Sequence, residues 1–179
     1  MSGKLTLISS ATASGSSSVE FTSGIDSSYD EYVFYFVDVN PATNDQDFSF
    51  QVNASGQSGY NESITSTYFA TVAREDGVDA SLGYDTGEDQ ANGTGEQTLT
   101  RRQKSDADTC VVGQLHLFAP SNTSKVTHFQ SRISGTTNTD QAQNVFVGGY
   151  INVTAAITSI RFKFASGNFD GNIYMYGVS

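Results

Sequence analysis

Two histidines are the side chains of this sequence best suited to acid–base chemistry or metal binding near neutral pH. His116 lies between Leu115 and Leu117, so in a strand its ring points away from both, toward the outer face of a sheet. His128 follows a threonine and precedes a phenylalanine. Neither histidine has a second histidine or a cysteine at the spacing of a zinc site. In a chain this rich in serine, Ser-His-Asp combinations arise by chance. We predict structural roles for both histidines.

Acidic pairs are the second source of possible chemistry, and all of them fall in segments expected to be loops. The pairs are Asp45 and Asp47, Glu75 and Asp76, Glu88 and Asp89, and Asp106 and Asp108. A glycosidase needs two carboxyl groups about 5 to 10 Å apart across a cleft, and the sequence sets none of these pairs opposite another. The loop at 83–96 has enough oxygen donors to bind Ca²⁺ weakly, with a plain solvated loop as the alternative. We therefore predict a protein that is not an enzyme and uses no cofactor or metal.

Charge and composition exclude several classes of partner. The chain has 179 residues and a net charge of −10, with a pI near 4.3. Such a surface repels phosphate backbones, and the basic cluster RRQK at 101–104 is flanked by acidic segments, so we predict no nucleic-acid partner. No apolar run approaches the roughly 18 residues of a membrane span, which predicts no membrane partner. Cys110 is the single cysteine, so no intrachain disulfide can form.

The apolar residues alternate with polar ones along most of the chain, as in DFSFQVN at 47–53 and SIRFKFA at 159–165. This period of two is typical of strands, and Gly-, Asn-, Asp- and Pro-rich turns separate the runs. We predict an all-β fold: one domain over residues 1–179, an antiparallel, jelly-roll-like β-sandwich of about 8 to 10 strands. Residues 74–110 read as a variable, loop-rich insertion with one short hairpin formed by ASLGYD and QTLTRR.

Two strands carry apolar residues on both faces. In EYVFYFVDV, which starts at residue 31, three aromatic residues share one face and Val33, Tyr35 and Val37 share the other. In NIYMYGV, near the C-terminus, Tyr174 and Tyr176 lie opposite the Ile and Met face. Such a strand is either covered on both sides within its own fold or lies at a subunit contact. The candidate interface residues are Tyr32, Phe34, Tyr35, Phe36, Tyr174 and Tyr176.

The last 18 residues, FKFASGNFDGNIYMYGVS, contain two apolar runs around a Gly-Asn-Phe-Asp-Gly segment. Glycine, asparagine and aspartate tolerate the positive φ angles of a tight reversal. We therefore predict a closing β-hairpin with a bulged or five-residue loop.

Three long segments carry a resemblance to a known group of proteins. They are LISSATASGSSSVEFTSGIDSSYDEYVFYFVDVNPATNDQDFSFQVN, LHLFAPSNTSKVTHF and FVGGYINVTAAITSIRFKFASGNFDGNIYMYGVS. The chain resembles uncharacterised virion structural proteins of tailed bacteriophages, many from aquatic hosts, over residues 5–73 and 111–179. The resemblance implies a protein made in the host cytoplasm and located in the virion. It supplies no catalytic residues.

This resemblance implies two kinds of function. The first is a capsid decoration or cement protein, expected to form a homotrimer and to stabilise the head by binding the major capsid protein. The alternative is a tail fibre or adhesin-type receptor-binding protein that recognises a host surface glycan. Its candidate surface is the loop at 83–96 together with Tyr60 and Tyr84, because aromatic faces can stack on sugar rings.

Overall fold

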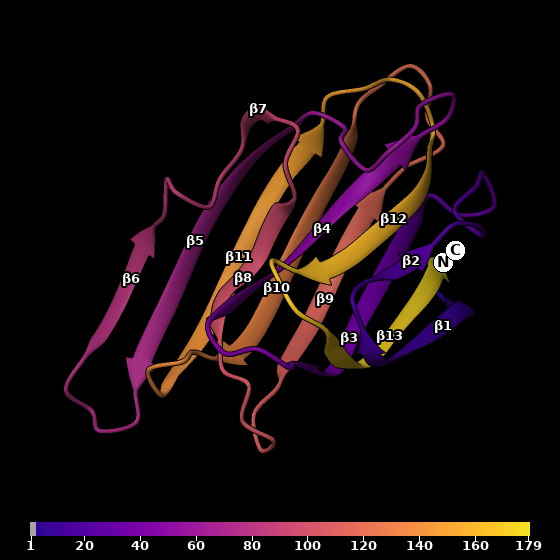
Figure 1. The fold of residues 1–179 in the computed structure, drawn as a ribbon. Helices are drawn as coiled ribbons and strands as arrows, with labels where there is room; N and C mark the ends of the chain where they lie inside the picture. The colour runs from indigo at the N-terminus through magenta and orange to yellow at the C-terminus, as the bar shows by residue number, and fades with distance from the viewer. Residues whose placement is uncertain (1–2) are drawn as a thin grey trace.

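The computed structural model describes residues 3–179, which form thirteen strands and no helix (Figure 1). The strands are β1 (Leu5–Ser16), β2 (Val19–Phe21), β3 (Glu31–Pro41), β4 (Gln46–Ala54), β5 (Ile64–Arg74), β6 (Ala80–Tyr84), β7 (Ala91–Gly93), β8 (Gln97–Gln103), β9 (Val111–Phe118), β10 (Thr127–Thr136), β11 (Gln141–Ile151), β12 (Ile157–Phe164) and β13 (Phe169–Val178). All the paired strands run antiparallel.

The strands form two sheets with the connectivity of a jelly roll. The large sheet has nine strands in the order β1-β13-β3-β9-β10-β11-β5-β6, with β7 also paired to β5, and the small sheet has the order β2-β12-β4-β8. The strands β1-β13-β3-β9 and the small sheet together make the two four-stranded layers of a jelly roll. The predicted fold class is confirmed. The strand count exceeds the predicted 8 to 10 because β10, β11, β5, β6 and β7 extend the large sheet beyond β9.

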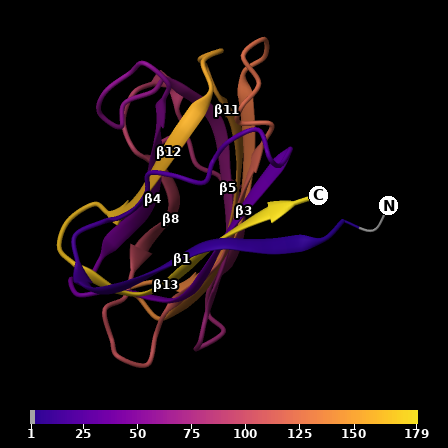
Figure 2. The same ribbon diagram turned by 90° about the vertical axis from the view of Figure 1, so that its right-hand side faces the viewer.

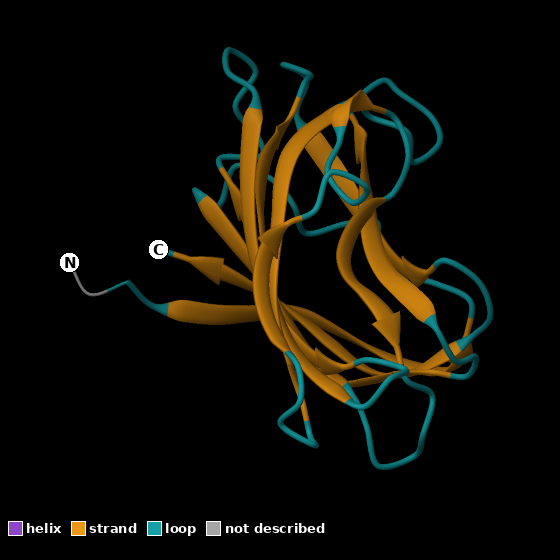
Figure 3. Ribbon diagram, turned by 90° about the vertical axis from the view of Figure 1, so that its left-hand side faces the viewer, coloured by secondary structure: helices purple, strands orange, loops and turns teal. Residues whose placement is uncertain are grey.

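A single apolar core fills the space between the two layers, which Figure 3 shows edge-on. Phe162 of β12 lies at its centre, with its ring centroid 5.1 Å from that of Phe36 and 5.4 Å from that of Phe34, both on β3. Phe50 of β4 makes a similar contact with Phe129 of β10, at 5.1 Å. The core therefore continues beneath the extension of the large sheet, and alternate residues of both sheets supply it.

Residues 74–110 differ from the prediction in how their strands pair. ASLGYD and QTLTRR both contain strands, as predicted, but they do not form one hairpin with each other. β6 pairs with β5 in the large sheet, whereas β8 pairs with β4 in the small sheet. Because Leu99 of β8 is fully buried in the core, this segment contributes a strand to the jelly roll itself.

The predicted closing hairpin is wrong. β12 belongs to the small sheet and β13 to the large sheet, so the turn at 165–168 carries the chain from one layer to the other. Gly167, with φ of 77°, supplies the positive backbone angle that this turn requires. β13 then lies between β1 and β3, which is why the C-terminal strand is so apolar. Alternation fixes which residues share a face, but it does not select the partner strand.

Candidate functional site

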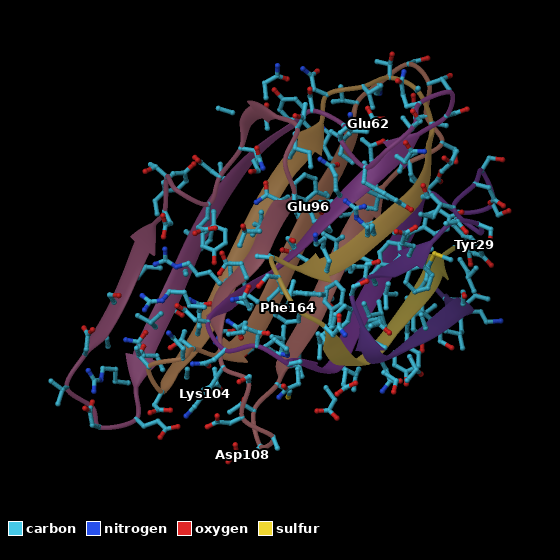
Figure 4. The ribbon with its side chains drawn as sticks, viewed as in Figure 1. Tyr29, Glu62, Glu96, Lys104, Asp108 and Phe164 are labelled. Carbon is cyan, nitrogen blue, oxygen red and sulfur yellow. The ribbon has the colours of Figure 1, made fainter. Side chains whose placement is uncertain are left out.

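The outer face of the small sheet is covered by the chain's own loops. Gln51 of β4 is fully buried there and donates hydrogen bonds to the carbonyl oxygens of Glu62, at 2.9 Å, and Gly95, at 2.8 Å. Arg161 of β12 forms an ion pair with Glu96, and its guanidinium lies 4.4 Å from the ring centroid of Tyr60. Figure 4 shows Glu62 and Glu96 on this side of the molecule. These polar contacts cover the small sheet around Gln51 and Arg161, whereas Glu20 of β2 remains exposed.

The outer face of the large sheet has no comparable cover, and it bears a row of rings. The register places seven side chains side by side across this face, in the order Tyr174, Tyr35, Gln114, Arg132, Phe146, Phe69 and Tyr84. Rings therefore lie at both ends of the row, with Gln and Arg between them. Figure 2 shows the two layers from the side, with the terminal ends of β1 and β13 projecting away from the small sheet. This exposed face is the candidate functional surface.

Three of the predicted interface residues do not lie on this surface. Tyr32, Phe34 and Phe36 are buried in the core, because they are on the face of β3 that packs against the small sheet. The Tyr32 hydroxyl accepts a hydrogen bond from the backbone N–H of Asp26 and donates one to its carbonyl oxygen, each at 2.9 Å. Burial raises the pKa of Tyr32. Their assignment to a subunit contact is therefore corrected to the core.

The other three predicted interface residues lie together and form what we call the tyrosine patch: Tyr35, Tyr174 and Tyr176. The rings of Tyr35 and Tyr176 meet edge to face, with centroids 5.6 Å apart. Leu7 of β1, which is 52% exposed, pairs directly with Tyr176, and Val37 of β3 is 45% exposed nearby. The three tyrosine rings are half-buried, and with the exposed aliphatic side chains beside them they form an apolar area of the kind found at interaction surfaces.

A second apolar area, the edge patch, lies at the opposite end of the large sheet and consists of Phe69, Leu82, Tyr84 and Phe146. The rings of Phe69 and Phe146 stack at 5.1 Å, while Leu82 and Tyr84 of the edge strand β6 are 71% and 53% exposed. The sequence alone does not indicate this patch as an interface. The signal it offers is the hydrophobic pair Leu82 and Tyr84 in ASLGYD, a segment that predicts only one strand of a short hairpin.

A hollow of about 340 Å³ opens on the same face, across the ends of β9, β10, β11 and β5. Its wall contains Phe118, His128 and Tyr150, and the rings of His128 and Tyr150 are 5.8 Å apart. Gly148 contributes no side chain to this region of β11, and Gly149 follows it. Sequence reasoning missed the hollow because its residues come from four separate strands.

The remaining candidate chemical residues do not assemble into a site. His116 faces outward as predicted, where it pairs with Glu31. Within residues 3–179, no group of three His, Cys, Asp or Glu side chains could hold a metal ion. Tyr60 lies over the small sheet, where Arg161 links it to Glu96 of the 83–96 loop, whereas Tyr84 lies on β6 of the large sheet, so the two tyrosines do not share one surface.

The 83–96 loop is stabilised by its own contacts. Tyr84 donates a hydrogen bond to Asp89, and Arg101 of β8 forms an ion pair with Asp85. Glu88 lies 3.9 Å from Arg101, but burial outweighs this attraction and raises the pKa of the Glu88 carboxyl. Asp85 therefore anchors this loop to β8.

Membrane association by a helix finds no support in residues 3–179, which lack any helix long and apolar enough to cross a bilayer.

Comparisons with known proteins do not identify a family for this chain. No protein-family model matches the chain, and no curated protein matches it. A solved structure from Bacteroides ovatus, of unknown function, is 4% identical over 56% of this chain and 44% of its own, with a TM-score of 0.32. The aerolysin-like protein of Bombina maxima is 8% identical over 93% of this chain and 91% of its own, with a TM-score of 0.14. Both TM-scores are too low to carry an inference.

Proposed function

We propose that this protein is a non-enzymatic structural protein of a tailed-bacteriophage virion, where it decorates the capsid and stabilises the head by binding the major capsid protein. The observation that carries the proposal is the contrast between its two outer faces. The chain's own loops cover part of the small sheet, whereas the large sheet bears two apolar patches of half-buried and exposed side chains. The sequence resemblance to virion proteins supports the same role. A net charge of −10 would keep many copies soluble before assembly.

We propose further that the tyrosine patch and the edge patch join copies of the chain into a homotrimer. The two patches differ from one another and lie at opposite ends of one sheet. A contact between two different patches is heterologous, and a heterologous contact whose rotation closes after three copies forms a trimeric ring. The exposed backbone of β6 at the sheet edge would add strand-like hydrogen bonds to this contact.

Light scattering on the purified protein tests the trimer. Wild type should have about three times the chain mass of 19.1 kDa, and Tyr174→Asp and Leu82→Asp should each be monomeric. Tyr174→Asp leaves the edge patch intact and Leu82→Asp leaves the tyrosine patch intact. A mixture of the two variants should therefore form a heterodimer. Gln130→Asp, on the same face between the patches, serves as the control and should remain trimeric. A monomeric wild type at high concentration would contradict the trimer.

Cryo-electron microscopy and copy counting of purified virions test the decoration role itself. A head protein should be present in hundreds of copies, with density on the outside of the capsid. Density confined to the tail, or absence of the chain from virions, would contradict it.

A further inference from the structure

The hollow on the large sheet is open because of one glycine. On β11, Gly148 lies between Gln130 of β10 and Thr67 of β5 in the register of the sheet. A Cβ added to Gly148 would meet nothing closer than the Phe129 carbonyl oxygen, at 4.0 Å. Polar side chains therefore flank this open position, and backbone forms its floor.

The wall of the hollow combines ring faces with uncharged polar groups. Phe118, His128 and Tyr150 lie directly opposite one another on three adjacent strands. Tyr150 is two residues beyond Gly148 on the same face of β11. The Thr67 hydroxyl donates to the Gly148 carbonyl at 3.2 Å, which leaves its oxygen able to accept a bond, and Gln130 is exposed. The lining includes no carboxylate, lysine or arginine. Most of the exposed lining is apolar, as in typical small-molecule sites.

A ligand for this hollow needs an apolar face to lie on the rings and hydroxyl groups to meet Thr67 and Gln130. A phosphorylated ligand is disfavoured because the lining contains no lysine or arginine and the chain carries a net charge of −10. A sugar ring has one face of C–H groups and several hydroxyls, and it carries no charge. We propose that the hollow around Gly148 binds a neutral pyranose of a glycan. This inference is independent of the decoration role.

Two-dimensional NMR of the ¹⁵N-labelled protein tests the proposal. Methyl glycosides of glucose, galactose and N-acetylglucosamine are the probes, each titrated to about 10 mM so that a Kd as weak as about 1 mM can be measured. At least one should shift the amide signals of residues 128–130 and 148–150. Adenosine, an uncharged ligand with a flat aromatic ring, is the alternative probe. If adenosine bound more strongly than every sugar, the assignment to a pyranose would be overturned.

Two variants locate the binding in the hollow. Gly148→Val fills the open position without a backbone clash, so the protein should fold normally and lose at least tenfold in affinity. Gly83→Val is the matched control, because Gly83 also has open space around it but lies on β6, outside the hollow. Tyr150→Ala removes a ring and should also weaken binding about tenfold, which is an independent check if Gly148→Val folds poorly. Unchanged affinity in both hollow variants, or no shift with any sugar, would refute the proposal.

Discussion

Phe162→Ala should be among the most destabilising single substitutions in this protein. Phe162 is fully buried, and the rings of Phe34, Phe36, Phe48 and Phe21 lie within 6.5 Å of its ring centroid. Replacing a buried phenylalanine with alanine costs about 3–5 kcal/mol through lost burial and the remaining cavity. Two of these rings lie on the opposite sheet and at most 5.4 Å away, and such pairs add about 0.5–1.5 kcal/mol each. We therefore expect a loss in the upper half of the 3–5 kcal/mol range.

Urea unfolding followed by circular dichroism measures this loss. With a slope near 2 kcal/mol per molar urea, a loss of about 4 kcal/mol lowers the midpoint by about 2 M. Lys163→Ala is the matched control, since its side chain is only half-buried and points away from the core. It should change stability by no more than about 0.5 kcal/mol.

The result also tests the packing between the two sheets. Phe162 belongs to the small sheet, and its nearest rings, Phe34 and Phe36, belong to the large sheet, so the loss measures contacts across the core. A loss below about 1.5 kcal/mol for Phe162→Ala, or an equal loss for Lys163→Ala, would refute the packing described above.

Three further predictions concern the backbone, pH and thiol reactivity. Gly149→Ala should lose more than about 1 kcal/mol of stability in urea unfolding while Gly148→Ala is nearly neutral, because an added Cβ at Gly149 would lie 2.3 Å from a backbone oxygen of β5; equal effects would contradict this. Burial raises the pKa of the Glu88 carboxyl above its ordinary value, so its contribution to stability is present below that ordinary pKa and is lost as pH rises through the folded pKa. Glu88→Gln should therefore unfold at a higher temperature than wild type near pH 7 but not near pH 4, as measured by calorimetry. Burial also raises the pKa of the Cys110 thiol, so it should react with a disulfide reagent near pH 8 more slowly than free cysteine does; an equal rate would contradict this.

The sequence predicted the faces of the strands well. Alternation correctly placed His116 outside and Leu115 inside, and it separated Tyr174 and Tyr176 from the core face of β13. For β3 the alternation sorted the residues correctly into two faces, but it did not show which face packs against the small sheet. Tyr32, Phe34 and Phe36 were therefore included among the interface candidates although they are in the core.

The tertiary structure alone decided the partners of each strand and the sites that depend on them. Side-chain direction follows from the local geometry of a strand, which every short segment of sequence carries with it. Pairing depends on contacts between residues far apart in the chain, so nothing local indicated that β12 and β13 lie in different sheets or that β8 joins β4. The hollow around Gly148 has the same origin, since four strands must align before a missing side chain becomes a site. The residues on each face could be predicted from the sequence, whereas the surface that they form required the fold.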